Sequence, residues 1–143
     1  ISDWADADIQ MDEFLESINN EFIFERDFIL KTAMVLLNEG AKYDVKKLRN
    51  DEIKNRIKIE WEKITNTIKQ IKDFIISNTY LRTDKALSSQ LALIPLIYFK
   101  YHFLNKWETT PQKQNYLLRV FYSSLLSKVF RYFLLLKTIF FFK

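Results

Sequence analysis

The chain has 143 residues and a formal net charge of +4. Hydrophobic residues make up 48%, enough for the core of one domain, and the presence of only one Gly and two Pro argues against the turn-rich all-β classes. The absence of cysteine excludes disulfides, cysteine-based zinc clusters and thiol nucleophiles, and it fits a reducing cytoplasm. We therefore expect a cytoplasmic, all-α protein: an irregular bundle of about five helices forming a single domain over residues 1–143.

The first two predicted helices lie in an acidic part of the chain. Residues 1–8 are predicted to form an acidic loop, followed by a short helix over residues 11–20 and a second helix over residues 25–38, both with apolar side chains at helical spacing. Gly40, the only glycine, stands where a left-handed helix cap is favoured. The second helix is therefore predicted to end there.

The third predicted helix is the longest. Asn50 is a good N-cap residue, and acidic residues follow it in the first turn, so the helix is expected to run over residues 51–77, about 40 Å in length. Its apolar residues recur at alternating steps of three and four, which predicts a seam that packs along most of the helix. The seam consists of Ile53, Ile57, Trp61, Ile64, Ile68, Ile71 and Ile75.

Two more helices are predicted after a polar connection over residues 78–85. The first is capped by Ser88 or Ser89, runs to about Trp107 and is apolar all round in its first half, as expected of a buried central helix. Pro95 is expected to kink that helix or to open a first turn. Pro111 suits the first position of the last helix, whose predicted core side comprises Tyr116, Leu117, Val120, Phe121, Ser124 and Leu125.

The Phe-rich tail, residues 128–143, has no assigned packing. Its longest uncharged stretch is about five residues, whereas a membrane span needs about 20, so no membrane partner is expected. Exposed, the tail would be a sticky apolar patch. It either packs on this domain, packs on a partner or a second copy of the chain, or arises from a changed reading frame or a truncation. Since the first residue is Ile1 rather than Met, we expect a fragment of a larger protein or a processed product.

Charge is unevenly spread along the chain. Residues 1–39 carry a net charge of −8 and residues 40–143 a net charge of +12. This layout fits surfaces for different partners, complementarity between segments, or merely differently solvated helix faces.

Residue counts exclude most catalytic sites. His102 is the only histidine, so neither a zinc site nor a testable Ser-His-Asp arrangement is expected, and we assign His102 a structural or surface role. One glycine cannot form a phosphate-binding Gly-rich loop. The acidic residues at the start lack the glycine of a calcium loop, so they are interpreted as complementing a helix dipole rather than binding metal; they are Asp3, Asp6, Asp8, Asp12 and Glu13. We expect no catalytic residue, no metal and no cofactor.

A basic segment is the remaining candidate site. Seven basic residues cluster within seventeen positions, a pattern that can contact the DNA backbone without reading sequence. The alternative is a solvated helix face, because acidic residues are interspersed among the basic ones. The predicted contact residues are Lys42, Lys46, Lys47, Arg49, Lys54, Arg56 and Lys58.

Three stretches resemble the helical region of the GmrSD-type restriction family. Within residues 79–107 the chain reads Asp-Lys-Ala-Leu-Ser-Ser-Gln-Leu-Ala-Leu-Ile-Pro-Leu, followed by aromatic residues. Upstream, residues 24–32 are similar to the family's Arg-Asp-Phe-x-Leu-Lys helix, and downstream residues 117–124 are similar to its Leu-x-Arg-aromatic-aromatic helix. The resemblance covers roughly residues 10–126 and rests on the order and spacing of these stretches. The tail departs from the family's polar pattern.

The resemblance implies a non-catalytic accessory domain of a prokaryotic phage-defence protein. In that family a ParB-like nucleotide-binding domain lies upstream and an HNH-type nuclease, where fused, lies downstream, so the parent protein would be an NTP-dependent restriction endonuclease. The expected partners are then the other domains of that protein and the DNA backbone. The alternative hypothesis is a stand-alone helical interaction or oligomerisation module, suggested by the isoleucine seam and the apolar tail.

Overall fold

The computed structural model describes residues 2–38, 50–87, 89–103 and 110–126. Within these ranges it contains five α-helices, two short 3-10 turns and no strand, which confirms the predicted all-α bundle. The α-helices are α1 (Ser2–Ile18), α2 (Arg26–Leu36), α4 (Asp51–Asn78), α5 (Ile94–His102) and α6 (Pro111–Leu126). The 3-10 turns are η1 (Asp84–Ala86) and η2 (Gln90–Leu93). None of the described helices is long and apolar enough to cross a membrane.

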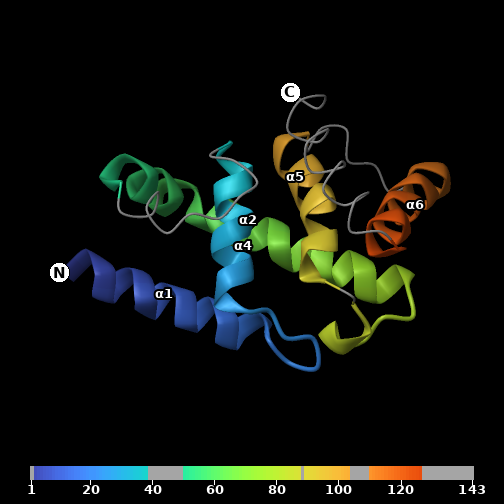
Figure 1. The fold of residues 1–143 in the computed structure, drawn as a ribbon, viewed down its shortest axis with the longest axis horizontal. Helices are drawn as coiled ribbons and strands as arrows, with labels where there is room; N and C mark the ends of the chain where they lie inside the picture. Colours follow the sequence, from blue (N-terminus) through green and yellow to red (C-terminus); the bar gives the residue numbers. More distant parts are fainter. Residues whose placement is uncertain (1, 39–49, 88, 104–109, 127–143) are drawn as a thin grey trace.

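Helix α4 runs along the molecule, and α2 and α5 cross it side by side (Figure 1). It begins where predicted, because the Asn50 side chain accepts a hydrogen bond of 2.9 Å from the backbone N–H of Glu52. Five of the seven residues of the predicted seam are buried, and Ile57 and Trp61 pack at the edge of the core. The seam faces α1, α2 and α5 of the same chain, as the regular spacing predicted.

The start of the chain is helical, so the predicted loop over residues 1–8 is wrong. Helix α1 begins at Ser2, nine residues earlier than expected, and ends at Ile18 near the predicted position. Acidic residues in the first turns favour the positive end of a helix, and the two alanines among them are strong helix formers. The acidic residues alone suggested a loop, whereas together with the alanines they favour the start of a helix. Met11, Phe14 and Ile18 form the buried face of α1.

The end of α2 differs in detail from the prediction. Asn38 adopts the left-handed conformation, with φ of 61°, and its N–H bonds to Val35 O at 3.0 Å, as in a Schellman-type cap. Asparagine tolerates this conformation better than most residues. Helix α2 ends at Leu36 and its left-handed residue is Asn38, two positions before Gly40, which itself lies outside the described residues.

The predicted single helix from residue 88 to 107 is divided. The Ser89 hydroxyl accepts a hydrogen bond from Leu91 N–H, so Ser89 is one of the two caps that were expected, but it opens the 3-10 turn η2. Pro95 then lies in the first turn of α5, where its missing N–H leaves no helical bond unmade. Of the two predicted effects of Pro95, opening a first turn is confirmed. Helix α5 ends at His102, five residues before the expected end.

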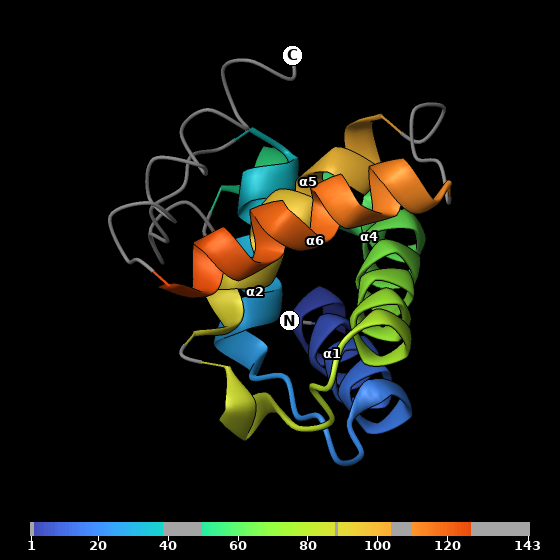
Figure 2. The same ribbon diagram turned by 90° about the vertical axis from the view of Figure 1, so that its right-hand side faces the viewer.

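Helix α5 is the central helix of the bundle, as predicted. Five consecutive residues from Ile94 to Tyr98 are buried, and α5 contacts α2, α4, α6 and η2. Figure 2, turned by 90°, shows α6 lying across α5 on one side of the bundle and α1 on the other.

Helix α6 begins at Pro111, as predicted, and packs through Leu117 and Phe121. Tyr116 was assigned to its core side, but 62% of Tyr116 is exposed, so that assignment is wrong. The helix turns by 100° per residue, and Leu117 with Phe121 defines a narrower stripe than the broad face we expected. The Phe-rich tail, residues 128–143, lies outside the described residues.

Candidate functional site

The predicted basic segment reaches into the described structure only at its end. Lys54, Arg56 and Lys58 lie in the first turns of α4. Lys58 is exposed, while the Lys54 ammonium lies 3.6 Å from the Asp51 carboxylate. Arg56 projects to another side of the helix, where its Nη2 donates to Leu37 O at 2.8 Å. The other four predicted contacts lie outside the described residues: Lys42, Lys46, Lys47 and Arg49.

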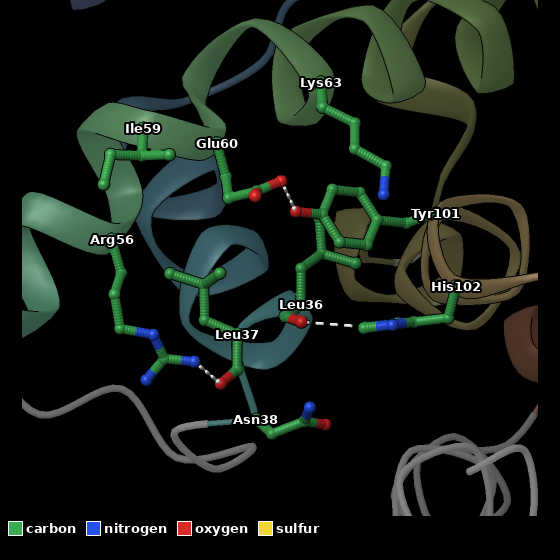
Figure 3. Close-up of a pocket in the computed structure, with 9 residues that line it drawn as sticks. All are labelled: Leu36, Leu37, Asn38, Arg56, Ile59, Glu60, Lys63, Tyr101 and His102. Carbon is green, nitrogen blue, oxygen red and sulfur yellow. Dashed lines mark hydrogen bonds between the residues drawn. The ribbon is translucent and has the colours of Figure 1, made fainter.

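Arg56 leads to an open pocket of about 350 Å³ between three helices (Figure 3). The end of α2, the first half of α4 and the end of α5 line it, so residues far apart in the sequence meet there. The lining residues are Leu36, Leu37, Asn38, Arg56, Ile59, Glu60, Lys63, Tyr101 and His102.

Helix α4 contributes one stripe of side chains to this pocket. Arg56, Ile59, Glu60 and Lys63 follow the i, i+3, i+4, i+7 spacing that places residues on one face. Arg56, Glu60 and Lys63 each directly precede a residue of the isoleucine seam. The stripe is therefore set by the same register that buries the seam, about 100° around the helix from it.

Tyr101 forms one wall of the pocket. Its hydroxyl donates to Glu60 Oε2 at 2.7 Å, and the Lys63 ammonium lies 4.2 Å from the centre of its ring. Burial, and then the hydrogen bond and negative charge of Glu60, raise the pKa of Tyr101 well above its usual range. The phenol therefore stays protonated at neutral pH and remains the donor to Glu60.

Two side chains of the pocket form hydrogen bonds with backbone carbonyls at the end of α2. His102 Nε2 lies 2.8 Å from Leu36 O, and since a carbonyl only accepts, Nε2 must carry a proton. The Arg56 bond to Leu37 O acts in the same way. Donors with positive charge are favourable here because the C-terminal end of a helix is negative. The contact also gives His102 a structural role, which agrees with the sequence-based interpretation.

The acidic residues at the start of the chain belong to a different part of the molecule. Asp8 Oδ1 accepts from Arg26 Nη1 at 2.7 Å, and Asp12 binds the other terminal nitrogen of Arg26. These ion pairs join α1 to α2 and raise the pKa of Arg26, with the Asp8 hydrogen bond as the largest cause. Within the described ranges, no group of three or more acidic, His or Cys side chains is placed to hold a metal ion.

Sequence reasoning did not single out Glu60, Lys63 or Tyr101. Lys63 lies seven residues after Arg56, which is a same-face spacing, so the pair was visible once α4 was accepted as one helix. Tyr101 had no such signal, because only the crossing of α5 over α4 brings its hydroxyl to Glu60.

Comparisons with protein-family models, with curated proteins and with solved structures find no match to this chain. The resemblance to the GmrSD-type family therefore stays a prediction.

Proposed function

We propose that this chain is a non-catalytic helical accessory domain that contacts the DNA backbone and positions the nucleotide-binding and nuclease domains of a prokaryotic phage-defence protein. The order of the three stretches that resemble the GmrSD-type family supports the domain arrangement. The basic segment supports the contact with DNA.

The DNA contact is supported by the way in which the basic segment joins the helices of the bundle. Its first four basic residues fall in the eleven residues between Asn38 and Asn50. Asn38 is held by its backbone bond to Val35 O and by Tyr98, whose hydroxyl donates to Asn38 Oδ1 at 3.1 Å. Asn50 caps α4. Residues 39–49 are thus flanked on both sides by packed helices, and Lys58 adds positive charge on the exposed side of α4.

This arrangement favours binding that depends on charge rather than on base sequence. Lysine and arginine neutralise phosphates and release counterions, so the affinity falls as salt is raised. We expect duplexes of different sequence to bind alike, and the segment to act as a positioning contact for the domains that carry the chemistry.

The test is charge reversal in the full chain. Lys46→Glu, Lys47→Glu and Arg49→Glu together are expected to weaken binding of a fluorescent DNA duplex at low salt. The salt slope is expected to fall by about one for each basic side chain that no longer neutralises a phosphate. Fluorescence anisotropy across a salt series measures both quantities.

The matched control reverses three exposed basic residues elsewhere: Lys85, Lys113 and Arg119. It changes the net charge by the same amount, so an equal loss of affinity would show a general charge effect. Binding that survives reversal of the basic segment would contradict the proposed DNA contact. The domain arrangement has its own test, because the full-length gene must encode a ParB-like domain upstream of Ile1.

The alternative, a stand-alone interaction or oligomerisation module, still rests on the apolar tail, which lies outside the described residues, and gains one observation on α6. Tyr116 and Tyr122 are both exposed on α6, and tyrosine is enriched in protein interfaces. The isoleucine seam no longer supports it, because the seam packs against other helices of the same chain. Sedimentation at increasing concentration separates the two functions: a monomer at all concentrations counts against self-association.

A further inference from the structure

We infer that the pocket between α2, α4 and α5 binds a phosphate group between Arg56 and Lys63. The inference rests on the proposed function, and it names one defined docking position for a phosphate at Arg56, one of the predicted DNA contacts. Lys63, Glu60 and Tyr101 are not among the residues predicted to contact DNA, so the inference assigns them a role.

The geometry places two cations around one cavity. Arg56 and Lys63 are two helical turns apart, about 10 Å along α4, and both are long enough to reach a ligand between them. Figure 3 shows Arg56 and Lys63 at the two ends of the α4 stripe with Glu60 between them; the Arg56 guanidinium is turned toward Leu37 and the Lys63 ammonium toward the Tyr101 ring. Ile59, 70% exposed, also lines the pocket, which is open to solvent.

The hydrogen-bonding groups of the pocket favour an anion. A guanidinium has five N–H donors and an ammonium three, and Arg56 and Lys63 bring both kinds of cation to the lining of the pocket. Asn38 Oδ1 accepts from Tyr98, which orients the amide N–H groups as a further donor at the rim. The carboxylate of Glu60 is the opposing charge, and the Tyr101 hydroxyl holds one of its oxygens. Arg56, Lys63 and Glu60 together have a formal charge of +1.

A phosphate suits this arrangement better than a carboxylate. The donors lie on different sides of the cavity, and a phosphate presents oxygens in several directions, whereas a carboxylate presents two oxygens in one plane. The cavity of about 350 Å³ is large enough for the group with part of an attached sugar. The same phosphate chemistry is supplied by a DNA backbone or by free phosphate, and the experiment must distinguish these sources.

The first test compares two lysine variants of the full chain. Lys63→Gln is expected to lower the affinity for a DNA duplex about three- to tenfold at low salt, because the variant removes one of the two charges that attract the phosphate. Lys85→Gln removes the same charge from η1, outside the pocket, and is expected to change the affinity less than twofold. Equal effects of both variants would overturn the pocket while leaving a diffuse basic surface, and with it the proposed function, intact.

The second test is designed to strengthen binding, which a folding defect would not do. Glu60→Gln keeps an oxygen that can accept from Tyr101 but removes the opposing charge, so phosphate and duplex affinity should both rise about three- to tenfold. Unchanged or weaker affinity in a variant with unaltered thermal unfolding would overturn the inference.

A titration with inorganic phosphate, followed by NMR shifts of the His102 ring, identifies the source of the group. Phosphate shifts that are displaced by duplex DNA indicate a backbone phosphate in the pocket. Phosphate shifts without any DNA binding indicate a free phosphate site, which supports the pocket and removes the proposed DNA contact. No shift at any concentration, together with full DNA binding by Lys63→Gln, overturns the pocket alone.

Discussion

Lys72 shows how one polar residue can join two helices in an apolar setting. It lies on α4 with 6% of its surface exposed, and its ammonium donates to Ile18 O and, at 3.0 Å, to Asn20 Oδ1. The charge thus sits at the C-terminal end of α1, where the helix dipole is negative. In the sequence Lys72 is one of many lysines between seam residues, and only the packing of α1 against α4 distinguishes it.

Replacing Lys72 by Met is expected to lower the free energy of unfolding by about 1–3 kcal/mol. The variant keeps the length of the side chain but leaves the Ile18 carbonyl at the end of α1 without its charged donor. Urea unfolding followed by circular dichroism measures the change. Lys58→Met, at an exposed position of the same helix, should change stability by less than about 0.5 kcal/mol. Equal effects of the two substitutions would remove the special role of Lys72.

Lys72 also makes the free energy of unfolding depend on pH. Burial lowers the pKa of Lys72 below its ordinary value of 10.5, opposed in part by the charge of Asp73. Between the folded and unfolded pKa values the unfolded chain binds more protons, so the contribution of Lys72 to stability rises with pH through that window. Stability measured relative to Lys72→Met should therefore increase as pH approaches 10.5. If the difference in free energy of unfolding between the unmodified chain and Lys72→Met did not change with pH, the lowered pKa of Lys72 would be contradicted.

At the scale of elements, the start of α4 depends on its cap. Asn50→Ala removes the acceptor for Glu52 N–H and is expected to cost about 1 kcal/mol of stability. Asn55→Ala, at an exposed position within the helix, removes the same amide without a cap and should be neutral or slightly stabilising. The urea midpoints of Asn50→Ala and Asn55→Ala, compared with that of the unmodified chain, measure the two changes in stability. A destabilisation at Asn55 as large as that at Asn50 would contradict the capping role.

The elements differ in how far local sequence determines them. Helix α4 was predicted almost to the residue because an N-cap, an acidic first turn and a regular seam all favour the same register. Helix α1 was predicted too short, because its acidic first turns resemble a polar loop. The helix dipole favours acids at this end and the alanines favour a helix, and only the two effects together indicate the true start. The division of residues 88–107 followed from Pro95, whose two possible effects were known but could not be ranked before its place in α5 was seen.

The candidate pocket depends on contacts that no local pattern contains. Its α4 stripe follows from helix periodicity, so Arg56 and Lys63 could be placed on one face. The partners supplied by α2 and α5 come from crossing helices, and the sequence separation of 41 residues between Glu60 and Tyr101 carries no local signal. The basic residues were found by composition alone, which predicted Arg56 but gave no reason to separate it from Lys54 or Lys58.

At the scale of the whole molecule, α5 joins the described helices in one core, so we expect the bundle to unfold as one unit. It is the helix that contacts α2, α4, α6 and η2 together, and Ile97 at its centre is fully buried. Ile97→Ala is therefore expected to leave a cavity that several elements share and to lower the free energy of unfolding by about 2–5 kcal/mol. Such a decrease is a large part of the roughly 5–15 kcal/mol that stabilises a typical domain.

The matched control is Ile59→Ala, which removes the same atoms from an exposed position of α4 and should change stability by less than about 0.5 kcal/mol. Because one core joins the described helices, circular dichroism and tryptophan fluorescence should report the same urea midpoint in Ile97→Ala and in the unmodified chain. Separate midpoints for the two probes would mean that part of the bundle unfolds on its own, and α5 would then link its neighbours without making them one unit.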